Sequence, residues 1–209
     1  MVKADLGDAL LFFEPSYLVR TGMEAFLVTR SSDRYFIDTL SELEGALKGG
    51  KPCALIMELY HQNEYLYDVL RFVLTAKNVW PEIPLVIFTA VEHPGILALL
   101  ATDARIAIVA KEEPLHCLRD AIAAAGEFSG YRSPHIRARL AHSPVALSDG
   151  EWRVLAMMAA GASPRSIANL TRRSYKTISS HKLNIMRKLS LNQAGFMRLI
   201  LTLRTRYPS

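Results

Sequence analysis

Hydrophobic residues between positions 8 and 126 form short uninterrupted runs, separated by longer segments in which they recur every three or four positions. Uninterrupted runs indicate strands buried on both faces, as in a parallel sheet covered by helices, and the longer period indicates amphipathic helices. The pattern predicts strands at 9–13, 34–38, 53–58, 85–89 and 105–110, the second being the least regular. It predicts helices near 17–28, 41–48, 63–78, 94–101 and 113–126.

Alternating strands and helices predict an α/β fold, because each helix returns the chain to the start of the next parallel strand. The five units fit a small doubly wound domain. Beyond Gly126 the periodicity weakens, and Gly130, Pro134 and Pro144 lie among three arginines. This composition is typical of a linker with room for a helical turn. We therefore expect a first domain at 1–127, a linker at 128–144 and a second domain at 145–209.

The second domain begins with helix signals. Ser148 and Glu151 have the spacing of a capping box, in which the serine caps the first turn and the glutamate returns to the serine backbone. Gly161 ends this helix after about twelve residues. Ser163 and Pro164 are residue types that begin a second helix. The residues expected to face inward from it are Ile167, Ala168 and Leu170.

A third helix is expected at 175–188, after a turn that contains two arginines. At about 100° per residue, Ile178, Ile185 and Leu189 fall on one face, which we expect to be core. His181 lies on the shoulder of that face and is expected to be a packed structural histidine rather than a ligand.

The opposite side of the third helix is cationic, rich in hydroxyl groups and nearly free of acids. Such a surface suits the major groove of DNA, where cations neutralise phosphates and short side chains reach base edges. A plain solvated basic face is the alternative. The candidate DNA-binding residues are Arg172, Arg173, Lys176, Thr177, Ser179, Ser180, Lys182, Leu183, Asn184 and Arg187.

Charge divides the chain at the same place. Residues 1–130 hold 11 Lys and Arg against 18 Asp and Glu, a net charge of −7, whereas residues 145–209 hold 11 against 2, a net charge of +9. An acidic front part joined to a strongly basic tail is typical of a regulatory domain coupled to a nucleic-acid-binding domain.

The runs LSDGEWRVL, SIANL and KTISSHKLNIMRKL closely resemble those of the LuxR-type (NarL/FixJ) helix-turn-helix, over about residues 145–205. The resemblance implies an all-α four-helix domain that binds double-stranded DNA. In that family the fourth helix, expected here at 192–206, serves dimerisation. Packing of the same stripe on the first helix remains the alternative. The stripe consists of Ala194, Met197, Ile200 and Leu201.

Five residues follow or end the predicted strands, where ligands and chemistry belong in an open parallel sheet. They are Glu14, Pro15, Glu58, Thr89 and Lys111. With LVRTG at 18–22, this layout resembles a response-regulator receiver domain over roughly residues 8–126. The resemblance implies that Glu14 and Pro15 stand at an acidic pair, Glu58 at the phosphate-accepting aspartate, and Thr89 and Lys111 at a Thr/Ser and a Lys.

Two of these positions depart from the receiver pattern. Pro15 offers no carboxylate for the divalent cation that phosphoryl transfer requires. Glu58 is one methylene longer than aspartate, so its charge can weakly mimic an aspartyl phosphate and form a permanent ion pair with Lys111. Our hypothesis is a degenerate pocket in a receiver that neither takes up phosphate nor needs it. The alternative is that these are polar strand-end residues with no switching role.

The run SYKTISSHKLNIMRKL resembles in particular the Rcs capsule-synthesis regulators and the BglJ-like auxiliary regulators. Members of that group commonly lack working phosphorylation pockets and pair with a phosphorylatable Rcs partner. The resemblance therefore implies a heterodimer with an Rcs-type response regulator, and a homodimer stays open. Two rival functions also stay open: a conventional phosphorylated regulator, and a protein-interaction antagonist that sequesters a partner regulator without reading DNA.

Several function classes lack support in the sequence. We find no nucleophile with a base, no glycine-rich phosphate loop and no clustered metal ligands, so we expect no enzyme, no metal site and no cofactor. Cys53 and Cys117 are expected to be buried thiols. No apolar stretch is long enough for a membrane span, and Asp5 and Asp8 before the first apolar run are unlike a signal peptide. We expect a cytoplasmic protein.

Overall fold

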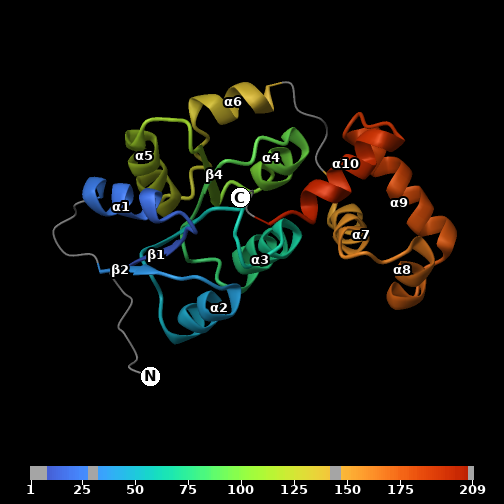
Figure 1. Cartoon of the computed structure of the whole chain (residues 1–209), viewed down its shortest axis with the longest axis horizontal. Helices are drawn as coiled ribbons and strands as arrows, with labels where there is room; N and C mark the ends of the chain where they lie inside the picture. The colour runs from blue at the N-terminus through green and yellow to red at the C-terminus, as the bar shows by residue number, and fades with distance from the viewer. Residues whose placement is uncertain (1–8, 28–32, 142–146, 207–209) are drawn as a thin grey trace.

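The computed structural model describes residues 9–27, 33–141 and 147–206, and Asp5, Asp8 and Pro144 lie outside these ranges. Its front part is a five-stranded parallel sheet covered by helices (Figure 1). The strands are β1 (Leu10–Phe13), β2 (Arg34–Phe36), β3 (Ala54–Met57), β4 (Leu85–Thr89) and β5 (Ile106–Ala110), in the spatial order β2-β1-β3-β4-β5. The predicted doubly wound α/β fold is confirmed, and the predicted strand ends differ from the observed ones by at most two residues.

Both faces of the sheet are buried, which explains the uninterrupted apolar runs. Leu11 and Phe13 of β1 pack in the cluster that includes α2, α3 and α4, whereas Leu10 and Phe12 pack in the cluster of α1 and α5. The helices are α1 (Tyr17–Phe26), α2 (Leu40–Gly49), α3 (Leu66–Val79), α4 (Pro94–Ala101) and α5 (Leu115–Gly126). The start of α3 is later than predicted, because residues 61 and 64 pair across a tight turn.

Much of the expected linker is packed on the edge of the sheet. The Ile108 backbone N–H donates to the Tyr131 carbonyl (2.9 Å), and the Ser133 N–H donates to the Ile108 carbonyl (3.0 Å). The helix α6 (Pro134–Leu140) follows and buries Ile136. The stretch is ordered because β5 is an edge strand whose free backbone groups offer it partners. The boundaries proposed for the two domains stay predictions.

The C-terminal part consists of α7 (Asp149–Ala159), α8 (Pro164–Thr171), α9 (Tyr175–Lys188) and α10 (Gln193–Leu203). The predicted capping box of Ser148 and Glu151 is present, and the Ser163 and Ser174 hydroxyls accept from backbone N–H groups three residues later. Gly161 follows α7 with a φ of +94°, in the left-handed region that favours glycine, so the predicted stop signal is confirmed.

Two predicted burials are wrong. Leu170 is 71% exposed, because the buried arc of α8 runs from Ile167 to Ala168 and Leu170 lies nearly opposite Ala168 on the helix. Cys53 is exposed, whereas Cys117 is buried as expected. Cys53 precedes β3 by one residue and so stands just outside the buried strand.

The two parts of the chain contact each other through α3, α7 and α10, which lie side by side in Figure 1. The Leu66 N–H at the start of α3 donates to the Thr205 carbonyl (3.0 Å). This bond serves as a cap, since Tyr65, the residue before α3, supplies none. The Arg206 guanidinium lies 4.4 Å from the centroid of the Tyr65 ring. Among the helices of the described ranges, none combines the length and hydrophobicity of a membrane span.

Candidate DNA-binding interface and receiver pocket

The third helix of the C-terminal part, α9, has the two faces predicted from its sequence. Ile178 and Ile185 are fully buried and Leu189, just after the helix, is 7% exposed. His181 is half-buried against α7, near Gly150. The opposite face is open to solvent. Its exposed members are Lys176, Ser180, Leu183 and Arg187, and its half-buried members are Thr177, Ser179 and Asn184.

The turn before α9 adds two exposed cations to the same end of the domain. Arg172 has a φ of +52° and ends α8, and Arg173 follows it. Ser174 then caps α9, so both exposed arginines lie in the chain just before the start of this helix. A helix N-terminus flanked by arginines favours phosphate binding.

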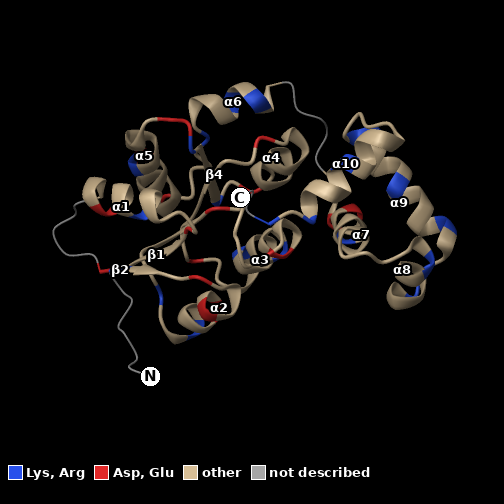
Figure 2. Cartoon of the chain, in the orientation of Figure 1, with Lys and Arg blue, Asp and Glu red and all other residues tan. Residues whose placement is uncertain are grey.

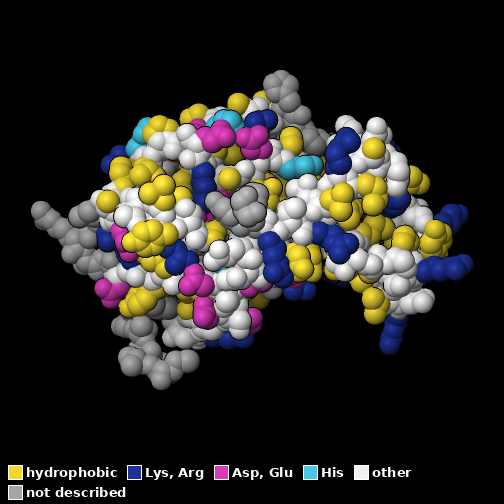
Figure 3. Space-filling model, in the orientation of Figure 1, with side chains coloured by type: hydrophobic (Ala, Val, Ile, Leu, Met, Phe, Trp, Pro, Cys, Tyr) yellow, Lys and Arg dark blue, Asp and Glu magenta, His cyan; other side chains and the backbone are white. Residues whose placement is uncertain are grey.

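The negative side chains of this domain lie on one helix, and most of the positive ones lie elsewhere. Figure 2 shows Lys and Arg along α8 and α9, and the acids in the first turn of α7. In Figure 3 dark-blue side chains protrude from the end of the molecule that α8 and α9 form. Lys182, one of the predicted DNA-binding residues, differs from the exposed cations. It is half-buried, and its ammonium lies 5.3 Å from the centroid of the Phe196 ring on α10.

The receiver pocket is built around Glu58, which is 1% exposed. Its Oε1 accepts hydrogen bonds from the Thr89 hydroxyl (2.5 Å), the Leu59 N–H (2.6 Å) and the Tyr60 N–H (3.1 Å). Its Oε2 accepts from the Ala90 N–H (3.1 Å). Both carboxylate oxygens are therefore fully engaged with groups at the carboxyl ends of β3 and β4.

Lys111 joins the two acids of the pocket. Its Nζ lies 2.7 Å from Glu14 Oε2 and 2.8 Å from Glu58 Oε2. Glu14 is also held by the Ser16 N–H, which donates to its Oε1 (2.9 Å). The structure thus brings together Glu14, Glu58, Thr89 and Lys111, all predicted from strand ends. The lysine ammonium lies between the two carboxylates and offsets part of their negative charge.

Burial and charge act against each other in this pocket. Burial raises the pKa of the Glu14 carboxyl, and the positive charge of Lys111 only partly offsets it. Burial by itself would lower the pKa of Lys111, but the two neighbouring carboxylates outweigh it and the pKa of Lys111 is raised. Lys111 is therefore charged at neutral pH and holds the pocket together.

The pocket has no second carboxylate next to Glu14, where the receiver pattern has an acidic pair. Pro15 stands at that position. A small hollow of about 10 Å³ lies near Thr89 and Lys111, but residues of α4, β5 and α6 line it, and Glu14 and Glu58 do not. Sequence reasoning missed the backbone donors at residues 59, 60 and 90. No side-chain pattern points to them, because any non-proline residue carries an N–H.

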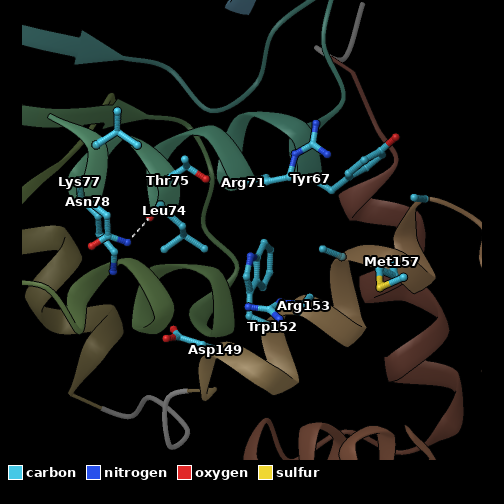
Figure 4. A pocket seen from close by; sticks show the side chains of 13 residues that line it. Tyr67, Arg71, Leu74, Thr75, Lys77, Asn78, Asp149, Trp152, Arg153 and Met157 are labelled. Carbon is cyan, nitrogen blue, oxygen red and sulfur yellow. Dashed lines mark hydrogen bonds between the residues drawn. The ribbon is translucent and has the colours of Figure 1, made fainter. Parts of the chain in front are cut away.

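A cleft of about 600 Å³ also separates α3 from α7. Figure 4 shows Leu74 of α3 and Trp152 of α7 pointing toward each other across it, with Arg153 beside the indole ring. Trp152 is 7% exposed, so other residues of the protein already cover most of its side chain. The two helices also contact each other, so the cleft lies beside the contact between the two parts of the chain.

Comparison with known proteins agrees with this architecture. Residues 145–194 match the GerE profile, described as bacterial regulatory proteins, luxR family. No curated protein matches the chain in sequence. RcsB from Salmonella enterica serovar Typhimurium, in a structure bound to the promoter rprA in the presence of the phosphomimetic BeF3⁻, is similar over 93% of this chain and 98% of that one, with 22% identity and a TM-score of 0.64. RcsB in a structure of two dimers bound to two parallel DNAs is similar over 94% and 98%, with 24% identity and a TM-score of 0.59.

These likenesses show the fold, a receiver-type domain followed by a helical domain. The profile match identifies residues 145–194 as a LuxR-type helix-turn-helix, the DNA-binding domain of a regulatory protein and not of an enzyme class.

Proposed function

We propose that this protein is a sequence-specific transcription regulator whose receiver-like domain works without phosphorylation. One observation carries the proposal: the chain combines an exposed cationic recognition helix, α9, with a pocket whose acids are already bound to Lys111. The pairing of Glu58 with Thr89 and Lys111 supports a permanently engaged state. On this proposal the protein acts in the cytoplasm, and occupancy of its operators follows protein and partner concentration.

Incubation with acetyl phosphate and Mg²⁺ tests the receiver. We expect no gain in intact mass, because Pro15 supplies no carboxylate for Mg²⁺ and both Glu58 oxygens already accept hydrogen bonds. A phosphorylatable receiver domain treated in parallel is the positive control. A stoichiometric adduct would favour the conventional phosphorylated regulator instead.

We further propose that the protein binds DNA as a dimer, with itself or with an Rcs-type response regulator. The expected apolar stripe on α10 is only partly buried. Ile200 is buried, whereas Met197 and Leu201 are 47% and 59% exposed. Ala194 is exposed on the same side. This free apolar side supports a dimer contact, and the similarity to RcsB, whose structure holds two dimers bound to two parallel DNAs, supports the same mode of assembly.

Footprinting of the protein alone, and together with partners co-purified from native cells, tests DNA binding. Protection by the protein alone indicates a homodimer, and protection only in the presence of a partner indicates a heterodimer. A chain that protects no DNA in either format would instead support the antagonist that sequesters a partner regulator.

A further inference from the structure

The first turn of α7 contains a buried carboxylate, Glu151, that does not belong to the candidate DNA-binding surface. Its side chain is 5% exposed. Its Oε2 accepts from the Ser148 N–H (2.8 Å) and from the Ser148 hydroxyl (3.0 Å). These two bonds are local to the capping box, and they tie Glu151 only to the start of its own helix.

A third contact goes beyond the capping box. The same Oε2 lies 2.7 Å from the Nζ of Lys188, in the last turn of α9. The Lys188 side chain is only 25% exposed, whereas Lys176 and Arg187 are open to solvent. Burial opposes the charged form of Glu151, but Lys188 and Ser148 outweigh it and lower the pKa of the carboxyl. Glu151 is thus charged in the folded domain.

We propose that Glu151 is a positioning residue for operator recognition, which fixes the C-terminal end of α9 to α7 through Lys188. The inference rests on the proposed function of α9 as the helix that reads DNA. The apolar contacts of Ile178 and Ile185 hold α9 against the domain but are not directional. A short charge-assisted hydrogen bond is directional and restricts sliding and tilting.

The length of α9 makes this restriction important. Its 14 residues span about 21 Å, so a tilt of about 5° around one end moves the other end by about 2 Å. A shift of that size breaks a hydrogen bond to a base edge, whereas phosphate contacts of long cationic side chains adapt to it. Loss of the ion pair should therefore reduce sequence discrimination more than total affinity.

The variant Glu151→Gln tests this point. Glutamine still accepts the capping-box bonds, but it removes the charge that holds Lys188. Asp149→Asn is the matched control, because Asp149 is an exposed carboxylate in the same turn and its replacement changes the charge by the same amount. The probes are a duplex selected from a random-sequence library by the wild-type chain and a scrambled duplex of equal length.

We expect Glu151→Gln to lower the ratio of the two affinities by about tenfold, and Asp149→Asn to leave it within about twofold. The ratio isolates positioning, since an unfolded fraction lowers both affinities equally. Lys188→Met should reproduce the loss of discrimination and Lys188→Arg should restore most of it. The double variant of Glu151→Gln and Lys188→Met should lose no more than either single variant.

Two results would overturn the inference while the proposed function stands. One is an unchanged affinity ratio in Glu151→Gln. The other is a Lys188→Met chain that loses affinity equally for both duplexes with a weaker salt dependence, which would make Lys188 a phosphate contact. A wild-type chain that selects no sequence from the library, either alone or together with its co-purified partner, would overturn the proposed function itself and this inference with it.

Discussion

At the scale of single residues, the contacts of Glu58 organise the pocket at the carboxyl ends of the strands. Glu58 stands where the receiver pattern has an aspartate, and its longer side chain reaches the Thr89 hydroxyl, the Ala90 N–H and Lys111 together. Lys111 is then bound to Glu14 on its other side. On our proposal, these contacts make the pocket independent of a phosphoryl group.

Lys111→Met tests this ion-pair network by leaving two carboxylates buried without a cation. We expect the free energy of unfolding to fall by about 3–5 kcal/mol, because the charges keep their desolvation cost and lose their partner. Urea denaturation at pH 7 measures the change. The control is Lys51→Met, which removes an exposed ion pair with Glu82 (3.1 Å) and should leave the free energy of unfolding nearly unchanged. Equal losses would contradict a stabilising role of the pocket.

At the scale of elements, two helices of the C-terminal part divide their surfaces between core and partner. One side of α9 buries Ile178 and Ile185, and the other presents cations and hydroxyl groups. One side of α10 buries Phe196, Leu199 and Leu203, while Met197 and Leu201 stay exposed. Each helix can therefore bind a partner without unpacking the domain.

The DNA-facing side of α9 is tested by salt dependence. In the double variant of Lys176→Ala and Arg187→Ala we expect weaker binding and a slope of log K against log salt that is smaller by about 2, because two phosphate contacts are lost. Fluorescence anisotropy with a labelled duplex between low and physiological salt measures the slope. Lys48→Ala, on α2 far along the chain, should leave it unchanged. An unaltered slope in the double variant would mean that another face binds DNA.

Leu201→Glu tests the exposed side of α10. We expect dimerisation on DNA to weaken more than about tenfold, since a buried carboxylate without a partner disrupts an apolar interface. Mass photometry of the DNA-bound complex measures the stoichiometry, with the co-purified partner added if the protein does not pair with itself. Leu170→Glu changes a leucine of similar exposure on α8 and should have no such effect. Equal behaviour of the two variants would place the dimer contact elsewhere.

At the scale of the whole molecule, the receiver-type part touches the end of the recognition helix. A Cβ at Gly95, in the first turn of α4, would lie 3.0 Å from the Cδ2 of Leu189, the residue that follows α9. The α4 helix begins shortly after Ala90, which is bound to Glu58. Packing between the parts thus connects the pocket with the DNA-binding domain through a few consecutive contacts.

Gly95→Leu should act as a wedge at this contact. We expect it to weaken the packing of the two parts by about 1–3 kcal/mol, because the added side chain overlaps Leu189. Small-angle X-ray scattering should then give a larger radius of gyration. Gly45→Leu is the control, since a Cβ at Gly45 meets no atom within 4 Å. A compact Gly95→Leu chain would show that the contact does not hold the parts together.

The sequence by itself determined the elements and their chemistry. Burial on both faces leaves uninterrupted apolar strands, and helix caps have specific residue types, so the sheet, the capping box at Ser148 and the two faces of α9 were predictable. The strand-end residues Glu14, Glu58 and Lys111 could also be placed at one edge. The same local reasoning failed for Leu170. In a short helix such as α8 few positions are apolar, so the sequence pattern does not fix the buried side to within one residue.

Only the tertiary structure decided which of these groups touch. The ion pair of Glu58 and Lys111 was predicted, but the contact of Lys111 with Glu14, the reach of Glu151 to Lys188 and the approach of Gly95 to Leu189 were not. Residues 131–133 likewise became an edge of the sheet only because β5 had free backbone groups. Local patterns determine which way a side chain points from its own helix or strand, but contacts within 3 Å depend on how all the elements pack.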